Sequence, residues 1–134
     1  MLSAKNISMS VLSAFNNQLV AFFEEMSETY PEEKDIKTAT EALKVLKKMN
    51  PKLIHATFME TVHKEFREPI LSRNDDYLVK RAHEIMHEKF SEMAFAFWIF
   101  DKHWKTMTET NKNHVWDYCK VLIVLAEKVP VDKA

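Results

Sequence analysis

The sequence contains no glycine in 134 residues, and this absence limits the folds open to the chain more than any other feature. At average usage, a chain of this length would hold roughly nine glycines. Loops that cradle phosphate, including the P-loop and the dinucleotide-binding fingerprint, need glycine because other residues avoid positive φ angles. Tight two-residue hairpins need it for the same reason, which disfavours a β-meander, sandwich or barrel. The sequence therefore predicts a chain that is nearly all helix.

Charge and cysteine content exclude several broad classes of protein. Nineteen basic and twenty acidic residues give a net charge of −1, so the overall charge attracts neither nucleic acid nor an anionic membrane. Cys119 is the single cysteine, which excludes an internal disulfide framework and a cysteine-based zinc site. Its apolar helix favours an inert buried thiol over a nucleophile. No apolar run reaches the length of a membrane span, and the N-terminal residues lack the pattern of a secretion signal, so we expect a soluble, non-secreted protein.

Apolar periodicity predicts the helices, and prolines and capping residues set their boundaries. The expected ranges are about 8–27, 31–49, 51–67, 75–104 and 110–129. Asn50 and Pro51 fit the N-cap and first position of the third helix, which we expect to end before Pro69, with a short helical turn at 69–72. The range 75–104 is long for a small domain, so one helix, or two with a break near Ser91, both stay open. The second helix should bury a stripe made of Ile36, Ala39, Leu43, Leu46 and Met49.

The C-terminal helix differs from the others in its apolar pattern. Its segment Val115–Ala126 is apolar almost all round, which is typical of a helix surrounded by other helices. No repeat, low-complexity tract or linker divides the chain. We expect one all-α domain over residues 1–134, a compact bundle of five or six helices with the apolar C-terminal helix at its centre.

One motif invites a catalytic interpretation. His83, Glu84 and His87 match the H-E-x-x-H pattern on a predicted helix, where two histidines four residues apart can bind one zinc ion and the glutamate can polarise its water. A third ligand is needed, and the extended form of the motif would require a glycine and a histidine where this chain has Phe90 and Met93. Asp101, His103 or Glu109 could supply that ligand in principle. We expect neither a cofactor nor a catalytic site, and keep a zinc hydrolase at His83, Glu84 and His87 as an alternative.

Four lysines form a second candidate. Lys44, Lys47, Lys48 and Lys52 surround the junction of the second and third helices and could meet a phosphate backbone. Lysines in the last turn of a helix are also favoured by its dipole, whatever the function. The cluster holds no arginine and no aromatic residue for base stacking. A nucleic-acid-associated accessory role is therefore an alternative function.

Aromatic residues are concentrated between residues 95 and 104. A helix carrying them presents apolar groups on every side, more than one core-facing stripe can bury in a chain of this size. Core packing alone and a protein interface are both consistent with this pattern, since aromatic residues are enriched at interface centres. The interaction surface we expect contains Phe95, Trp98, Phe100 and Trp104.

Five further segments are informative when taken together: Phe15–Leu19, Pro31–Lys37, Lys48–Pro51, Ile99–Trp104 and Val115–Lys128. They resemble a small all-helical protein family of large DNA viruses of algae and protists. The resemblance implies a viral, non-secreted helical protein of the host cytoplasm or nucleus, or of the virion, and it transfers no activity and no functional residue. The H-E-x-x-H stretch is not a shared feature of that family.

These observations lead to one expected function. We expect a non-enzymatic helical module, structural or for protein–protein interaction, that presents an apolar surface to a protein partner or to a second copy of itself.

Overall fold

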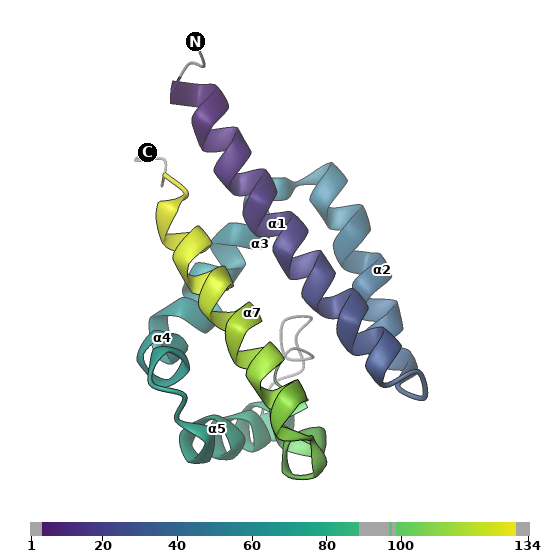
Figure 1. The fold of residues 1–134 in the computed structure, drawn as a ribbon. Coiled ribbons are helices and arrows are strands. Elements are labelled where there is room, and N and C mark those ends of the chain that lie inside the picture. Colours follow the sequence, from purple (N-terminus) through teal and green to yellow (C-terminus); the bar gives the residue numbers. More distant parts are fainter. Residues whose placement is uncertain (1–3, 89–96, 98, 131–134) are drawn as a thin grey trace.

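The computed structural model describes the backbone of residues 4–88, 97 and 99–130, and side chains within 11–85, 97 and 100–130. The helices, shown in Figure 1, are α1 (Ala4–Thr29), α2 (Lys34–Met49), α3 (Pro51–Phe58), α4 (Lys64–Leu71), α5 (Asp75–Glu88) and α7 (Glu109–Lys128). Two π-helical segments (Met59–His63 and Ile99–His103) and a 3-10 turn (Trp104–Thr106) complete the described elements. The described residues form no strand, which confirms the all-α bundle.

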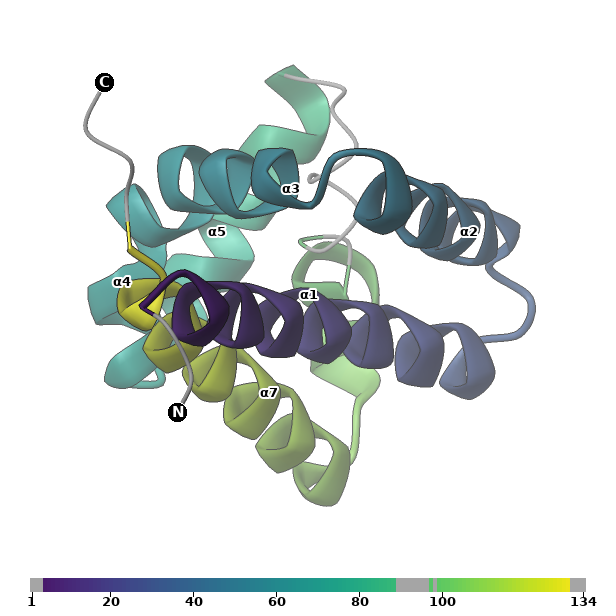
Figure 2. The same cartoon turned by 90° about the horizontal axis from the view of Figure 1, so that it is seen from above.

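Helix α1 forms the axis of the bundle. It packs against α2, α3 and α7, and the view from above in Figure 2 shows these three helices around it. Phe15 is fully buried and makes edge-to-face contacts with Phe58 and His55, with ring centroids 5.0 and 5.5 Å away. The apolar spacing in the sequence therefore brings α1 and α3 together through aromatic packing. The buried apolar residues of α1 are Leu12, Phe15, Leu19, Val20, Phe22, Phe23 and Met26.

Helix α7 packs against α1 and α4, but it is not enclosed on every side as its sequence suggested. Val115, Trp116 and Ile123 are buried, whereas Val121 and Val124 are each 41% exposed. Helical spacing places these two valines on the same side as the exposed Asp117 and Lys128, away from the core. The central position belongs to α1 instead.

The helix that starts at Pro51 does not end before Pro69. The chain continues as α3, the π-helical segment and α4 as far as Leu71, with Pro69 inside α4. Proline in a helix interior removes one backbone hydrogen bond, but here the helix ends two residues later, so the loss falls in its final turn. Burial of Phe66 and Ile70 on either side of Pro69 holds this turn against the core.

Two helices begin with side-chain caps. The side chain of Asn74 accepts a hydrogen bond from Tyr77 N at 3.2 Å, and that of Thr108 accepts one from Asn111 N at 3.1 Å. Asn50 precedes α3 without a side-chain cap. Within the range 75–104, α5 is described as far as Glu88, and the expected break near Ser91 lies outside the described residues. No helix in the described parts of the chain is long and apolar enough to cross a membrane.

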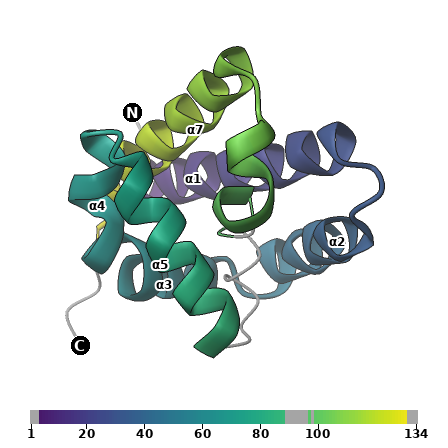
Figure 3. The same cartoon turned by 90° about the horizontal axis from the view of Figure 1, so that it is seen from below.

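The turn between α4 and α5, seen from below in Figure 3, reverses the direction of the chain without a glycine. Arg73 has a φ of 52°, the left-handed conformation that glycine usually supplies at a helix C-terminus. Asn74 N donates to Pro69 O at 2.8 Å, and Arg73 N donates to Ile70 O at 3.1 Å. These two bonds are those of a Schellman motif, here closed by an arginine.

Contacts with α7 hold Arg73 in this conformation. Its guanidinium donates to Asn113 Oδ1 at 3.2 Å and lies 3.3 Å from Asp117 Oδ1. The left-handed conformation costs a residue with a Cβ roughly 1–2 kcal/mol. The side-chain contacts to α7 therefore compensate part of a backbone cost.

Comparing two substitutions at Arg73 separates these contributions. Arg73→Gly and Arg73→Ala both lose the contacts to α7, but only alanine keeps the Cβ. We expect the glycine variant to be more stable than the alanine variant by about 1 kcal/mol, measured by urea unfolding. Equal stabilities, or a more stable alanine variant, would contradict a left-handed Arg73.

Candidate functional site

The two residues of the H-E-x-x-H motif with described side chains have protein partners in the structure. His83 lies on α5 with 62% of its side chain exposed, and its Nδ1 is 2.9 Å from Asp101 Oδ1. Glu84 Oε2 accepts a hydrogen bond from Arg81 Nη1 at 2.7 Å. The side chain of His87 lies outside the described residues. Glu84 is thus held by an arginine on its own helix rather than by a residue that would aim it at a metal-bound water.

The possible third ligands lie in different surroundings. Asp101 contacts His83, whereas His103 is part of a cluster around Glu33. Among the residues with described positions, no group of three or more histidine, cysteine, aspartate or glutamate residues could hold a metal ion. The described residues therefore contain no set of ligands for the metal ion that such a hydrolase would need.

One member of the lysine cluster at the α2–α3 junction, Lys44, forms ion pairs with two glutamates. Lys44 Nζ lies 3.3 Å from Glu24 Oε1 and 3.5 Å from Glu41 Oε1, and the hydrogen bond to Glu24 is the main cause that raises the pKa of Lys44. Lys48 and Lys52 are exposed, and Lys47 is half-buried. Lys44 belongs to the contact between α1 and α2, where two carboxylates offset its charge, and a phosphate-binding role of the four lysines stays a prediction.

Two of the four residues expected to form the interaction surface lie in the core, which corrects that expectation. Phe100 and Trp104 are buried and pack on each other, with ring centroids 4.8 Å apart. Trp116 of α7 completes the cluster edge-on to Trp104 at 5.3 Å, and Trp104 Nε1 donates to Asp75 Oδ2 at 3.0 Å. The indole thus has both apolar surroundings and a partner for its N–H. Phe95 and Trp98 lie outside the described residues.

The single thiol shows no sign of activation. Cys119 adjoins the core of the bundle, and burial raises its pKa to about 12. A thiol with such a pKa is protonated at neutral pH and is a poor nucleophile.

An apolar groove lies instead between α2 and α3, with α1 at its floor. We call it the α2–α3 groove; its volume is about 280 Å³ and its lining is mostly apolar. Phe23, Leu43 and Ile54 are buried at its base. The residues that line it are Phe23, Asp35, Thr38, Ala39, Ala42, Leu43, Leu46, Leu53, Ile54 and Thr57.

Large apolar side chains are exposed next to this groove. Met49 is 78% exposed, Val45 56% and Leu53 46%. Leu53 lines the groove, and helical spacing places Val45 and Met49 beside Ala42 and Leu46, which also line it. Six large apolar side chains are exposed in the described part of the chain, and these are three of them. Met49 was expected inside the stripe buried by the second helix, so its exposure is a correction.

Sequence patterning alone could not find this groove. The spacing of Leu43, Leu46 and Met49 indicates an apolar face on α2 but not which part of that face another helix covers. Helix α3 begins at Pro51 and covers only the inner part of this face of α2. Ile54 is therefore buried, while Leu53 and Met49 remain exposed. The combination of an amphipathic helix and a short, proline-started neighbour is the one signal that could have pointed here.

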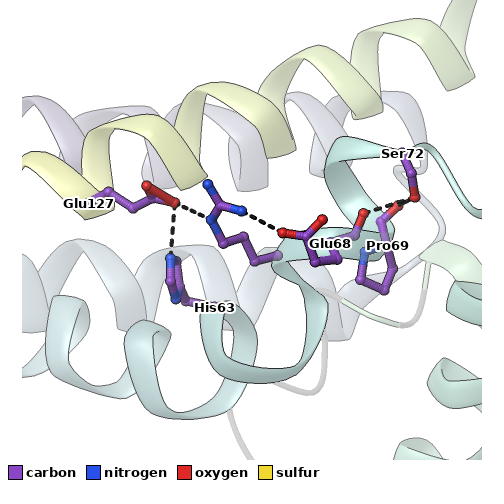
Figure 4. Close-up of polar contacts among 6 residues, drawn as sticks. His63, Glu68, Pro69, Ser72 and Glu127 are labelled. Carbon is purple, nitrogen blue, oxygen red and sulfur yellow. Dashed lines mark hydrogen bonds and ion pairs between the residues drawn. The ribbon is translucent and has the colours of Figure 1, made fainter.

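Polar clusters elsewhere join helices to one another. Figure 4 shows the carboxylate of Glu127 on α7 beside the His63 ring, where Oε1 lies 3.1 Å from His63 Nε2. The same oxygen accepts a hydrogen bond from Arg67 Nε at 2.6 Å. Arg67 also donates to Glu68 at 2.6 Å. Arg67, with a smaller effect from His63, lowers the pKa of Glu127. The cluster ties α7 to α4 and to the π-helical segment before it.

A more shielded cluster surrounds Glu33, the residue before α2. Glu33 Oε1 lies 2.7 Å from Lys102 Nζ and 3.1 Å from His103 Nε2, and Tyr30 stacks on the His103 ring at 4.0 Å. Glu33 is almost entirely buried, and the hydrogen bond from Lys102 is the main cause that lowers its pKa. The cluster joins the α1–α2 connection to the segment before α7.

Comparisons with known proteins add no relative. No family model, no curated protein and no solved structure matches the chain. The resemblance to a viral family therefore stays an expectation from the sequence.

Zinc binding can be measured directly by native mass spectrometry of untagged protein purified without chelator. We expect no zinc retained at a one-to-one ratio, because the described residues contain no group of three side chains that could hold a metal ion. A zinc ion retained at one per chain and lost in His83→Ala would contradict this interpretation.

Substitution of Glu33 should change how stability depends on pH. Because the pKa of Glu33 is lowered in the folded state, its ionised form stabilises the protein above the ordinary carboxyl value of 4.5, and this stabilisation is lost as the pH falls through the lowered pKa. We expect Glu33→Gln to reduce the free energy of unfolding by about 1–3 kcal/mol at neutral pH, with a difference that shrinks in acid. The exposed Glu28 provides the control Glu28→Gln, for which we expect little change. A constant Glu33→Gln difference across the acid range would argue against the cluster.

Proposed function

We propose that the protein is a non-enzymatic helical module for protein–protein interaction, and that the α2–α3 groove is its contact surface. The observation that supports this most directly is the exposure of Val45, Met49 and Leu53 beside an apolar groove. Burying side chains of this size contributes roughly 1.5–3 kcal/mol each when they are fully removed from water. Such residues clustered on one face are typical of a site that another protein covers.

The surface proposed here differs from the aromatic one expected from the sequence. Phe100 and Trp104 are buried in the core, while the exposed apolar residues beside the groove belong to α2 and α3. The nucleic-acid alternative has less support, because Lys44 is engaged by Glu24 and Glu41 and the groove itself is apolar. The zinc-hydrolase alternative lacks a ligand set among the described residues.

Site-specific photo-crosslinking tests this proposal. A photoreactive amino acid placed at Met49 or Leu53 should give a crosslinked product in the cells that make the protein. Val121 and Val124 on α7 provide matched controls, because they are also exposed aliphatic side chains but lie away from the groove. We expect a discrete product of defined mass from the groove positions and none of that mass from the α7 positions.

With the photoreactive amino acid at Leu53, the double variant Val45→Glu/Met49→Glu should abolish that product, because charges at the groove edge oppose its burial. Val121→Glu/Val124→Glu should leave it unchanged. Thermal unfolding of both variants verifies that they fold. The same product from all four positions, or one that persists in the groove variant, would count against the α2–α3 groove as the contact surface.

A further inference from the structure

We propose that the occupant of the α2–α3 groove is an amphipathic helix of another protein with acidic residues flanking its apolar stripe. This inference rests on the proposed function and specifies the chemistry of the partner.

The shape of the groove favours a helix. Two helices form its walls and Phe23 of α1 lies at its base, so the site is a concavity rather than a flat or protruding surface. At about 30 Å³ per molecule, its 280 Å³ corresponds to roughly nine waters, which is enough room for a few apolar side chains. A helix laid in such a groove inserts anchors at positions i, i+3, i+4 and i+7.

The spacing along α2 matches such anchors. Counted from Ala42, the residues Val45, Leu46 and Met49 lie at positions i+3, i+4 and i+7, and Leu53 lines the same groove from α3. This repeat is the one by which two helices pack side by side. It is therefore complementary to a stripe of the same spacing on a partner helix.

Charge around the groove indicates the flanks of the partner. Residues 34–52 contain six lysines against Asp35 and Glu41, a net charge of +4 in a chain whose net charge is −1. Lys34, Lys37 and Lys48 are exposed, and helical spacing places them along the outer edge of α2 next to Thr38 and Val45. Glu41 on the same edge is paired with Lys44. Complementary charges across an interface set partner choice and register, so acidic flanks fit this edge.

The alternative occupants explain less of the site. A nucleic acid would use the lysines but not the apolar groove beside them. An anionic membrane would use the lysines and Met49, but a bilayer surface does not fill a concavity with Phe23 at its base. Both become outcomes of the test.

Selection from a displayed library of helical peptides tests the inference. The peptides are about 20 residues long, sufficient for a stable helix, with apolar positions drawn from Leu, Ile, Met, Phe and Ala and flanking positions drawn from Glu, Gln and Lys. We expect the binders of the full-length protein to carry Glu on their flanks. Replacing these residues by Lys in a selected peptide should weaken binding by about tenfold or more, measured by fluorescence anisotropy.

Variants of the protein locate the interaction. Val45→Glu/Met49→Glu should abolish binding, and the matched Val121→Glu/Val124→Glu should not. Lys37→Glu/Lys48→Glu should shift the preference from the Glu-flanked peptide to its Lys-flanked counterpart. Such an inversion would be absent if the groove bound any apolar helix.

The outcomes separate this inference from the proposed function. Groove-dependent binders with neutral or basic flanks would overturn the acidic partner while keeping the groove as an interaction site. Failure to select any groove-dependent peptide would overturn the helix as occupant. Titration with an anionic lipid vesicle and with duplex DNA completes the test, since tight binding of either that Val45→Glu/Met49→Glu abolishes would also overturn it. A crosslinked product from Met49 that proves to be a second copy of this chain would overturn the inference and retain the proposed function.

Discussion

The packing of Phe15 against α3 is the contact on which the arrangement of the other helices depends. It lies at the middle of the long helix α1, is fully buried, and meets Phe58 and His55 edge-on. His55 in turn reaches α7, where its Nε2 is 2.9 Å from Ala126 O. One side chain on α1 thus fixes α3, and through α3 it fixes the end of α7. The α2–α3 groove exists because α3 is held inward by this contact and leaves the outer part of α2 uncovered.

The spacing of apolar residues correctly predicted burial wherever a single apolar stripe of a helix packs against the core. Ile54, Phe58, Val62 and Phe66 are all buried as that spacing requires. The apolar spacing failed to predict burial where burial depends on the position of a neighbouring helix, which the spacing does not specify. Met49 continues the apolar stripe of α2 but is exposed at the end of the helix, and Val121 lies in an apolar run whose outer side is exposed.

Local rules failed where tertiary contacts outweighed them. Pro69 should end a helix, yet burial of Phe66 and Ile70 carries the chain through it. Aromatic density suggested a surface at Phe100 and Trp104, but Trp116, twelve residues beyond Trp104, arrives from α7 and encloses them. The candidate site was missed for the same reason, since it consists of what remains uncovered after the helices have packed.

The left-handed Arg73 has a consequence for what stabilises the corner between α4 and α5. In most helical proteins a glycine lets such a corner form locally, before the distant parts of the chain are in place. Here the corner between α4 and α5 is held by Asn113 and Asp117, about forty residues away on α7. Local backbone hydrogen bonds and the contact of Arg81 with Glu65 already join α4 to α5, so the docking of α7 adds stability to a corner whose left-handed residue costs about 1–2 kcal/mol. Because the chain has no glycine for this corner, the reversal between α4 and α5 is stabilised in part by α7. Among the described helices, α7 is the last to be synthesised.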